Sequence, residues 1–201
     1  MRTDRAMLLA QAKCNKDEAL GELLEQYRNY LKLLAGMELG RRMRRKVDPS
    51  DLVQETFLDA HRNFPNFVGT TEPQFTNWLR QILATNASNL LRQYLGTQAR
   101  DIRLEEDLTT SFQNSGARFR DISAPSAESP SQDAMGHEQE IELANAISQL
   151  PDDYREVIVL RHWEAKSFPE IATQMGRSLD SVEKLWMRGV MRLRASMGER
   201  Q

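Results

Sequence analysis

Residues 167–194 have the sequence SFPEIATQMGRSLDSVEKLWMRGVMRLR. This stretch predicts two helices around a tight turn. Ser167 is expected to cap the first helix, with Glu170 reaching back to close a capping box. Gly176 supplies a residue suited to the turn after the first helix, and Ser178 offers an N-cap for the second. The order of these signals is typical of a helix-turn-helix.

The second of these helices has two chemically different faces. Lys184, Arg188 and Arg192 recur every four residues and form a cationic stripe. A stripe of this kind is usually a solvated helix face, but here it follows the capped turn in the order that a DNA-recognition helix requires. We therefore predict that the helix reads DNA in the major groove. The residues expected to be buried on its other face are Val182, Leu185, Trp186, Gly189 and Leu193.

Length and composition allow one domain or two small ones, because the chain has 201 residues of which 40% are hydrophobic. No run of 18 apolar residues predicts a membrane span, and the first ten residues lack the apolar centre of a signal peptide. We expect a cytoplasmic protein. Its one cysteine, Cys14, cannot form an internal disulfide and is expected to be an incidental thiol.

Charge divides the chain into three parts, although the net charge is only -2. Residues 1–103 carry 16 basic and 12 acidic side chains, residues 104–153 carry 2 and 11, and residues 154–201 carry 9 and 6. Two mildly basic blocks thus flank an acidic one. The composition predicts domains at residues 1–103 and 138–201, joined by an acidic flexible linker at residues 104–137. Phe112 and Phe119 in this linker are either docking anchors or stray aromatic residues.

The first block is predicted to be helical throughout. A helix with buried Leu20, Leu23, Leu24, Tyr27, Tyr30, Leu31 and Leu34 is expected to end near the basic run Arg41–Lys46. These cations suit the negative end of the helix dipole, and contact with nucleic acid is the open alternative. Asp48 and Pro49 then signal the start of the next helix.

This next helix, through Phe64, is expected to bury Val53, Phe57, Ala60 and Phe64. An acidic, exposed face is left, formed by Asp51, Gln54, Glu55 and Asp59. Since no other segment supplies converging ligands, we expect neither a metal site nor catalysis there. A docking surface for a basic partner is the preferred interpretation.

A long helix is predicted after a loop that contains two prolines and a glycine. Its apolar side carries Phe75, Trp78, Leu79, Ile82, Leu83, Leu90, Leu91 and Tyr94, and its polar side Asn86, Asn89, Arg92 and Gln93. Asparagine is a poor helix former. The asparagines are therefore either contacts to an outside partner or solvated polar positions.

Three segments resemble extracytoplasmic-function sigma factors of bacterial RNA polymerase: DLVQETFLDA at 51–60, FTNWLRQILA at 75–84, and LPDDYREVIVLR at 150–161 before the helix-turn-helix. The resemblance covers about residues 18–103 and 138–197. It implies an all-α fold with two small helical domains, a region 2 bundle and a region 4 helix-turn-helix, joined by the flexible linker. The implied function is to direct core RNA polymerase to specific promoters and to assist promoter melting in transcription initiation.

The resemblance also implies partners and sites, namely core RNA polymerase, promoter DNA and an anti-sigma factor, with no cofactor and no metal. Asp51, Gln54 and Glu55 are expected to bind core polymerase. The minus-10 element would be captured as unstacked bases by a set comprising Phe67, Trp78, Asn86, Asn89 and Arg92. The minus-35 element would be read as duplex by Arg177, Ser178, Ser181, Lys184, Arg188 and Arg192.

The chain departs from the family pattern in both domains. Thr85 stands where many members have asparagine, and Asn89 opens what is usually an Asp-x-x-Arg motif. Glu183 and Leu185 occupy positions where basic residues are common.

Two other functions agree less well with the sequence than that of a sigma factor. A helix-turn-helix regulator acting without core polymerase does not account for the segment at 51–60. An enzyme is disfavoured because the sequence has no phosphate-binding glycine loop, zinc spacing or nucleophile motif. We expect no enzymatic activity, and no C-terminal regulatory extension because the chain ends seven residues after Arg194.

Overall fold

A computed structural model describes residues 4–14, 17–43, 48–95, 102–113 and 133–198. Every regular element within these ranges is a helix, which confirms the predicted all-α class. The chain divides into two compact units, an N-terminal unit of Met1–Ser115 and a C-terminal unit of Gly116–Gln201.

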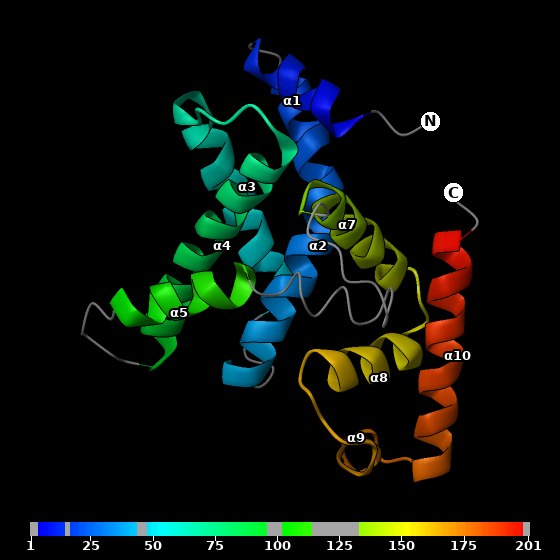
Figure 1. Ribbon diagram of the computed structural model, residues 1–201. Helices are drawn as coiled ribbons and strands as arrows, with labels where there is room; N and C mark the ends of the chain where they lie inside the picture. Colours follow the sequence, from blue (N-terminus) through cyan, green and yellow to red (C-terminus); the bar gives the residue numbers. More distant parts are fainter. Residues whose placement is uncertain (1–3, 15–16, 44–47, 96–101, 114–132, 199–201) are drawn as a thin grey trace. The chain divides into compact units, whose positions relative to one another are not determined.

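The N-terminal unit is organised around one long helix. Its elements are α1 (Arg5–Lys13), α2 (Asp17–Met43), α3 (Pro49–Asn63), the 3-10 helix η1 (Phe64–Asn66), α4 (Glu72–Leu95) and α5 (Ile102–Gln113). Helices α1, α3 and α4 pack against α2, and α5 packs against α4 (Figure 1). Leu23, Tyr27, Leu31 and Leu34 of α2 are fully buried, as their spacing predicted. The side chains of the basic run Arg41–Lys46 lie outside the described residues.

Helix α3 begins where the sequence predicted. Asp48 is its N-cap and accepts a hydrogen bond from the backbone N–H of Ser50 at 2.8 Å, which lowers the pKa of the Asp48 carboxyl. Pro49 occupies the first helical position. The buried side of α3 includes Leu52, Val53 and Ala60. Phe57 and Phe64 were predicted to be buried, but both are only half-buried.

Two buried tyrosines join α2 to α4 through their hydroxyl groups. The Tyr27 hydroxyl accepts a hydrogen bond from Thr76 Oγ1 at 3.3 Å, and the Tyr30 hydroxyl accepts one from Arg80 Nε at 2.6 Å. Burial raises the pKa of Tyr27 to about 12. Tyrosine can remain in such a core because its polar end finds a partner there.

Helix α5 corrects the prediction of an irregular linker from residue 104 onwards. Residues 104–113 are helical, and Leu108 and Phe112 are fully buried. Phe112 is therefore a core residue rather than a stray aromatic. Phe119 and the rest of the predicted linker up to residue 132 lie outside the described residues.

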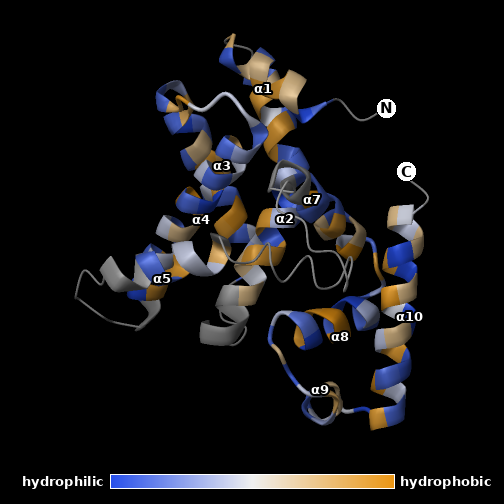
Figure 2. Cartoon of the chain, viewed as in Figure 1, coloured by the Kyte–Doolittle hydropathy of each residue, from blue (hydrophilic) through white to orange (hydrophobic). Residues whose placement is uncertain are grey.

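The C-terminal unit contains α7 (Asp133–Ser148), α8 (Asp152–His162), α9 (Phe168–Met175) and α10 (Leu179–Gly198). Helix α10 packs against α7, α8 and α9. Its hydrophobic and hydrophilic residues alternate around the helix (Figure 2), and Val182, Gly189 and Leu193 are buried. Arg155 holds the turn between α7 and α8, since its Nη2 donates to the carbonyls of Ser148 at 3.1 Å and Leu150 at 2.8 Å.

Candidate nucleic-acid interface

The helix-turn-helix formed by α9 and α10 matches the sequence prediction closely. Glu170 Oε2 accepts hydrogen bonds from the backbone N–H of Ser167 at 2.8 Å and from its hydroxyl at 2.6 Å. These bonds, that of the hydroxyl first, lower the pKa of Glu170. Gly176 ends α9 in the left-handed conformation, with φ 63° and ψ 36°. Ser178 Oγ accepts from the backbone N–H of Ser181 at 3.3 Å and so caps α10.

Aromatic stacking fixes the first half of α10 against the rest of the unit. The indole N–H of Trp186 donates to His162 Nε2 at 3.1 Å, and the two rings stack with centroids 6.1 Å apart. Phe168 meets the same indole edge-on at 5.6 Å. Trp186 and Leu185 were predicted to be buried and are half-buried instead, because their positions lie at the border of the packed face.

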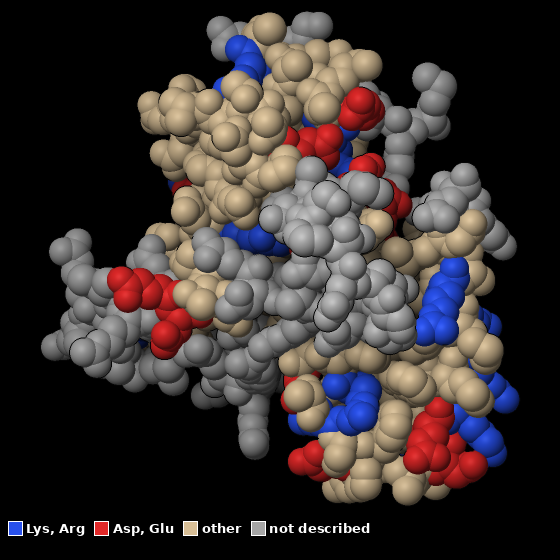
Figure 3. Space-filling model, viewed as in Figure 1, with Lys and Arg blue, Asp and Glu red and all other residues tan. Residues whose placement is uncertain are grey.

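The cationic stripe of α10 faces solvent, but its members are not equivalent. Lys184 Nζ lies 2.7 Å from Asp180 on the previous turn. The Arg192 guanidinium lies over the Tyr154 ring, 4.9 Å from its centroid. Arg188 is exposed and makes no ion pair with any residue that the structure describes. Figure 3 shows basic side chains along the edge of the molecule that α10 occupies, with acidic ones among them near one end.

The turn itself contributes further polar groups. Arg177 is exposed and its Nη2 lies 2.5 Å from Asp153 Oδ2 of α8. Ser178 is exposed and Ser181 is half-buried. All six residues predicted to contact the minus-35 element therefore lie on α10 or on the turn that precedes it.

The acidic face of α3 is exposed at three of its four predicted positions. Asp51, Gln54 and Glu55 are all exposed, whereas Asp59 is half-buried and pairs with Arg62 Nη1 at 3.3 Å. Among the side chains that the structure describes, no group of three or more histidines, cysteines or acids is arranged to hold a metal ion. The face can thus offer charge to a partner.

An aromatic cluster lies beside the loop that joins α3 to α4. It consists of Phe64, Phe67, Phe75 and Trp78, and the Phe67 and Trp78 ring centroids are 4.8 Å apart. Gly69 packs against Phe67 so closely that a Cβ atom there would collide with the ring. The predicted residues Phe67 and Trp78 are therefore brought together, both half-buried.

The loop after Phe67 is held by a local hydrogen-bond pattern. Gln74 Oε1 accepts from the backbone N–H groups of Thr70 at 2.8 Å and Thr71 at 3.2 Å, and Thr71 Oγ1 accepts from the Gln74 N–H at 3.4 Å. Val68, which the sequence analysis did not single out, is 91% exposed at the loop. Its exposure makes Val68 a candidate contact residue. The sequence could not indicate this, because a valine is usually expected to be buried.

The polar side of α4 differs from the prediction at one position. Asn86 is only 5% exposed, and its Nδ2 makes no hydrogen bond to any described residue. The prediction that it lies on the polar side is wrong, because it falls among the buried positions Leu83, Ala87 and Leu91. Asn89 is exposed and its Oδ1 accepts from Arg92 Nη2 at 2.7 Å.

Comparisons with known proteins connect these surfaces to a family. Residues 26–96 match the family model described as Sigma-70 region 2, and residues 140–193 match that described as Sigma-70, region 4. The ECF RNA polymerase sigma-E factor of Haemophilus influenzae is 32% identical over 175 residues, which cover 86% of this chain and 84% of that protein. The chain belongs to the extracytoplasmic-function (ECF) sigma factors. The predicted family is confirmed, and with it a role in transcription initiation.

A second curated relative and a solved structure are also similar to this sigma factor. The RNA polymerase sigma-H factor of Pseudomonas aeruginosa is 32% identical over 128 residues, which cover 64% of this chain and 62% of that protein. The solved structure of CnrH in complex with the cytosolic domain of CnrY covers 98% of this chain at 24% identity, with a TM-score of 0.37. Within the described ranges, no helix of the sigma factor is both long and apolar enough to cross a membrane.

Proposed function

We propose that this sigma factor brings core RNA polymerase to promoters by using separate surfaces for the enzyme and for two promoter elements. The observation that carries the proposal is the capped helix-turn-helix of the C-terminal unit, whose recognition helix exposes Lys184 and Arg188. Its minus-35 contacts are proposed to be Arg177, Ser178, Ser181, Lys184, Arg188 and Arg192. The sigma factor itself is proposed to catalyse no reaction and to act in the cytoplasm, where it would meet the polymerase.

Core polymerase is the proposed partner of the acidic face of α3. Asp51, Gln54 and Glu55 are exposed on one side of a helix whose opposite side is buried. A basic partner surface would gain charge-assisted hydrogen bonds without disturbing the fold. An anti-sigma factor is a further proposed partner, for which no surface is assigned.

The minus-10 element is proposed to meet the loop at residues 67–71 and the exposed side of α4. Phe67 and Trp78 support the loop as half-buried rings, while Asn89 and Arg92 offer polar contacts. Asn86 would reach a base only after leaving its buried position. A prearranged loop lowers the entropy lost when it binds an unstacked base.

Run-off transcription with core polymerase on genomic fragments tests the proposed function. Discrete transcripts that depend on the sigma factor are the expected result. A helix-turn-helix regulator that acts without core docking would instead bind duplex DNA alone and give no transcripts with core. Co-purification of core polymerase and sigma factor at a one-to-one ratio separates these two cases.

A further inference from the structure

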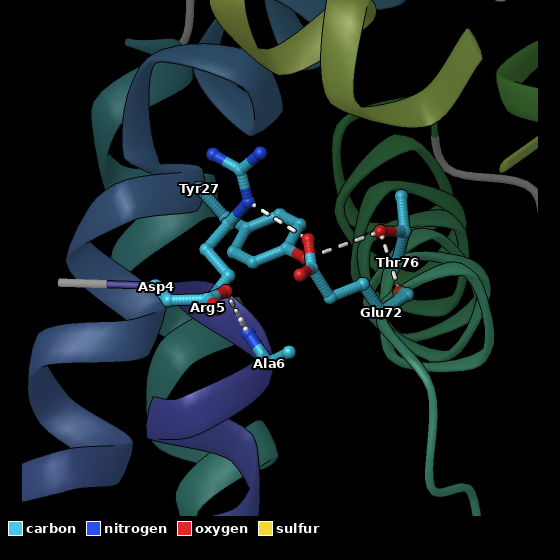
Figure 4. Close-up of polar contacts among 6 residues, drawn as sticks. All are labelled: Asp4, Arg5, Ala6, Tyr27, Glu72 and Thr76. Carbon is cyan, nitrogen blue, oxygen red and sulfur yellow. Dashed lines mark hydrogen bonds and ion pairs between the residues drawn. The ribbon is translucent and has the colours of Figure 1, made fainter. Parts of the chain in front are cut away.

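Helix α1 lies outside the residues that match Sigma-70 region 2, yet a partly buried ion pair ties it to the start of α4. Arg5 Nε lies 3.0 Å from Glu72 Oε2, and the two side chains are 6% and 26% exposed. Figure 4 shows this pair beside the buried Tyr27 ring. Asp4 caps α1 by accepting from the Ala6 N–H at 3.0 Å.

The ion pair links α1 to the loop at residues 67–71 through the position of Glu72. Glu72 is the first residue of α4 and directly follows the loop at residues 67–71. Leu8, Leu9 and Ala12 of α1 are also buried. Helix α1 therefore packs on α2, and Arg5 ties it to the residue that follows the loop.

Lys13, the last residue of α1, lies at the edge of the same loop. Its Nζ is 5.3 Å from the centroid of the Phe67 ring, and its side chain is exposed. Among the described residues no carboxylate forms an ion pair with Lys13. Val68 protrudes from the loop one residue after the ring that Lys13 covers.

We propose that Lys13 binds a backbone phosphate of the melted strand, next to the base that the loop captures. This inference rests on the proposed function of the loop at residues 67–71. The Lys13 ammonium is exposed at the loop that is proposed to capture a base, and cationic side chains that follow the backbone beside a base-binding site are typical of single-strand binding. The cation–π contact with Phe67 holds the ammonium in place before DNA arrives.

The test measures how salt weakens the open complex of the holoenzyme on a promoter found by run-off transcription. Affinity is followed through the fluorescence of 2-aminopurine in the non-template strand, at saturating core polymerase. Lys13→Gln is expected to reduce the slope of log affinity against log salt by about 0.7, the value for one phosphate contact on a single strand. Lys13→Arg should keep the wild-type slope.

Lys32→Gln is the matched control, because Lys32 is exposed on α2 near Asp48, at the start of α3 rather than at the loop. Its slope should equal that of the wild type. An unchanged slope in Lys13→Gln overturns the inference, and a lowered melting temperature with that unchanged slope would show that Lys13 serves only to pack against Phe67. If the wild-type holoenzyme melts no fragment, the proposed function itself fails and the inference falls with it.

Discussion

At the scale of single residues, Tyr27 links the stability of the N-terminal unit to alkaline pH. Burial raises its pKa from 10.0 to about 12, so the folded chain keeps a proton that the unfolded chain releases. The free energy of unfolding therefore keeps its full value below about pH 10 and falls as the pH rises through about 12. The total fall due to Tyr27 is at most about 2.7 kcal/mol. Between about pH 9 and about pH 11, the free energy of unfolding measured in urea should fall less for Tyr27→Phe than for the wild type. Equal losses would contradict the assignment.

Arg188 and Arg192 should differ when each is replaced by alanine. Arg188 is exposed and without an ion pair among the described residues, so Arg188→Ala is expected to cost about 1–3 kcal/mol of promoter binding and to relax preference at one base pair. Arg192→Ala should weaken binding to all sequences equally and reduce the salt slope by about 1. Binding of holoenzyme to a set of minus-35 variants at several salt concentrations checks both.

Tyr154 provides the control for Arg192, because the guanidinium packs on its ring. Tyr154→Leu should lower the stability of the C-terminal unit by about 0.5–1 kcal/mol through loss of the cation–π contact. It should leave the salt slope unchanged. A base-specific effect of Arg192→Ala would mean that α10 enters the groove in another orientation.

At the scale of elements, α3 is predicted to bind core polymerase through its exposed face. Reversing charge with Asp51→Lys and Glu55→Lys should abolish or strongly weaken core binding. The free energy of unfolding should change by about 0.5 kcal/mol or less, apart from a small loss of the favourable interaction between Asp51 and the helix dipole. Glu22→Lys, an exposed acid on α2, should bind core normally. Affinity is measured by fluorescence anisotropy of labelled sigma factor. Unchanged affinity in the double variant would reject the docking face.

The turn between α9 and α10 should depend on one glycine. Gly176 has φ 63°, where a side chain costs about 1–2 kcal/mol, so Gly176→Ala is expected to destabilise the C-terminal unit by that amount. Gly21→Ala is the opposite case, since Gly21 lies within α2 with open space around it. That change should stabilise by about 0.5–1 kcal/mol. Thermal unfolding of both variants makes the comparison.

Elements with strong local signals were predictable from sequence, and those that depend on packing were not. The caps at Asp48 and Ser178 and the left-handed Gly176 are encoded by residue type at fixed positions. Helix α5 was missed because its threonines and serine are weak helix formers, and packing on α4 favours the helix. Asn86 was misplaced because its polar residue type was followed, although its spacing of three or four residues from Leu83 and Leu90 places it on the apolar side of α4.

At the scale of the whole molecule, the boundary between the two units predicts where an N-terminal fragment must end to be fully stable. A chain ending at Ser115 retains α5, whereas one ending at Arg103 loses the buried Leu108 and Phe112. Each such side chain is worth about 1.5–3 kcal/mol, so the shorter fragment should be less stable by about 3–6 kcal/mol. Urea unfolding of both fragments tests this. Equal stability would show that α5 does not complete the N-terminal unit.

The anchored loop also bears on how promoter choice can diverge. Gln74 and Gly69 fix the backbone around Val68, whose side chain is 91% exposed and contributes little to the core. Under the proposed minus-10 role of the loop, replacing Val68 should alter which base is favoured, and because the side chain is exposed the fold should be almost unchanged. Single substitutions at Val68 would then give rise to new regulons without the loss of stability that usually restricts the evolution of specificity.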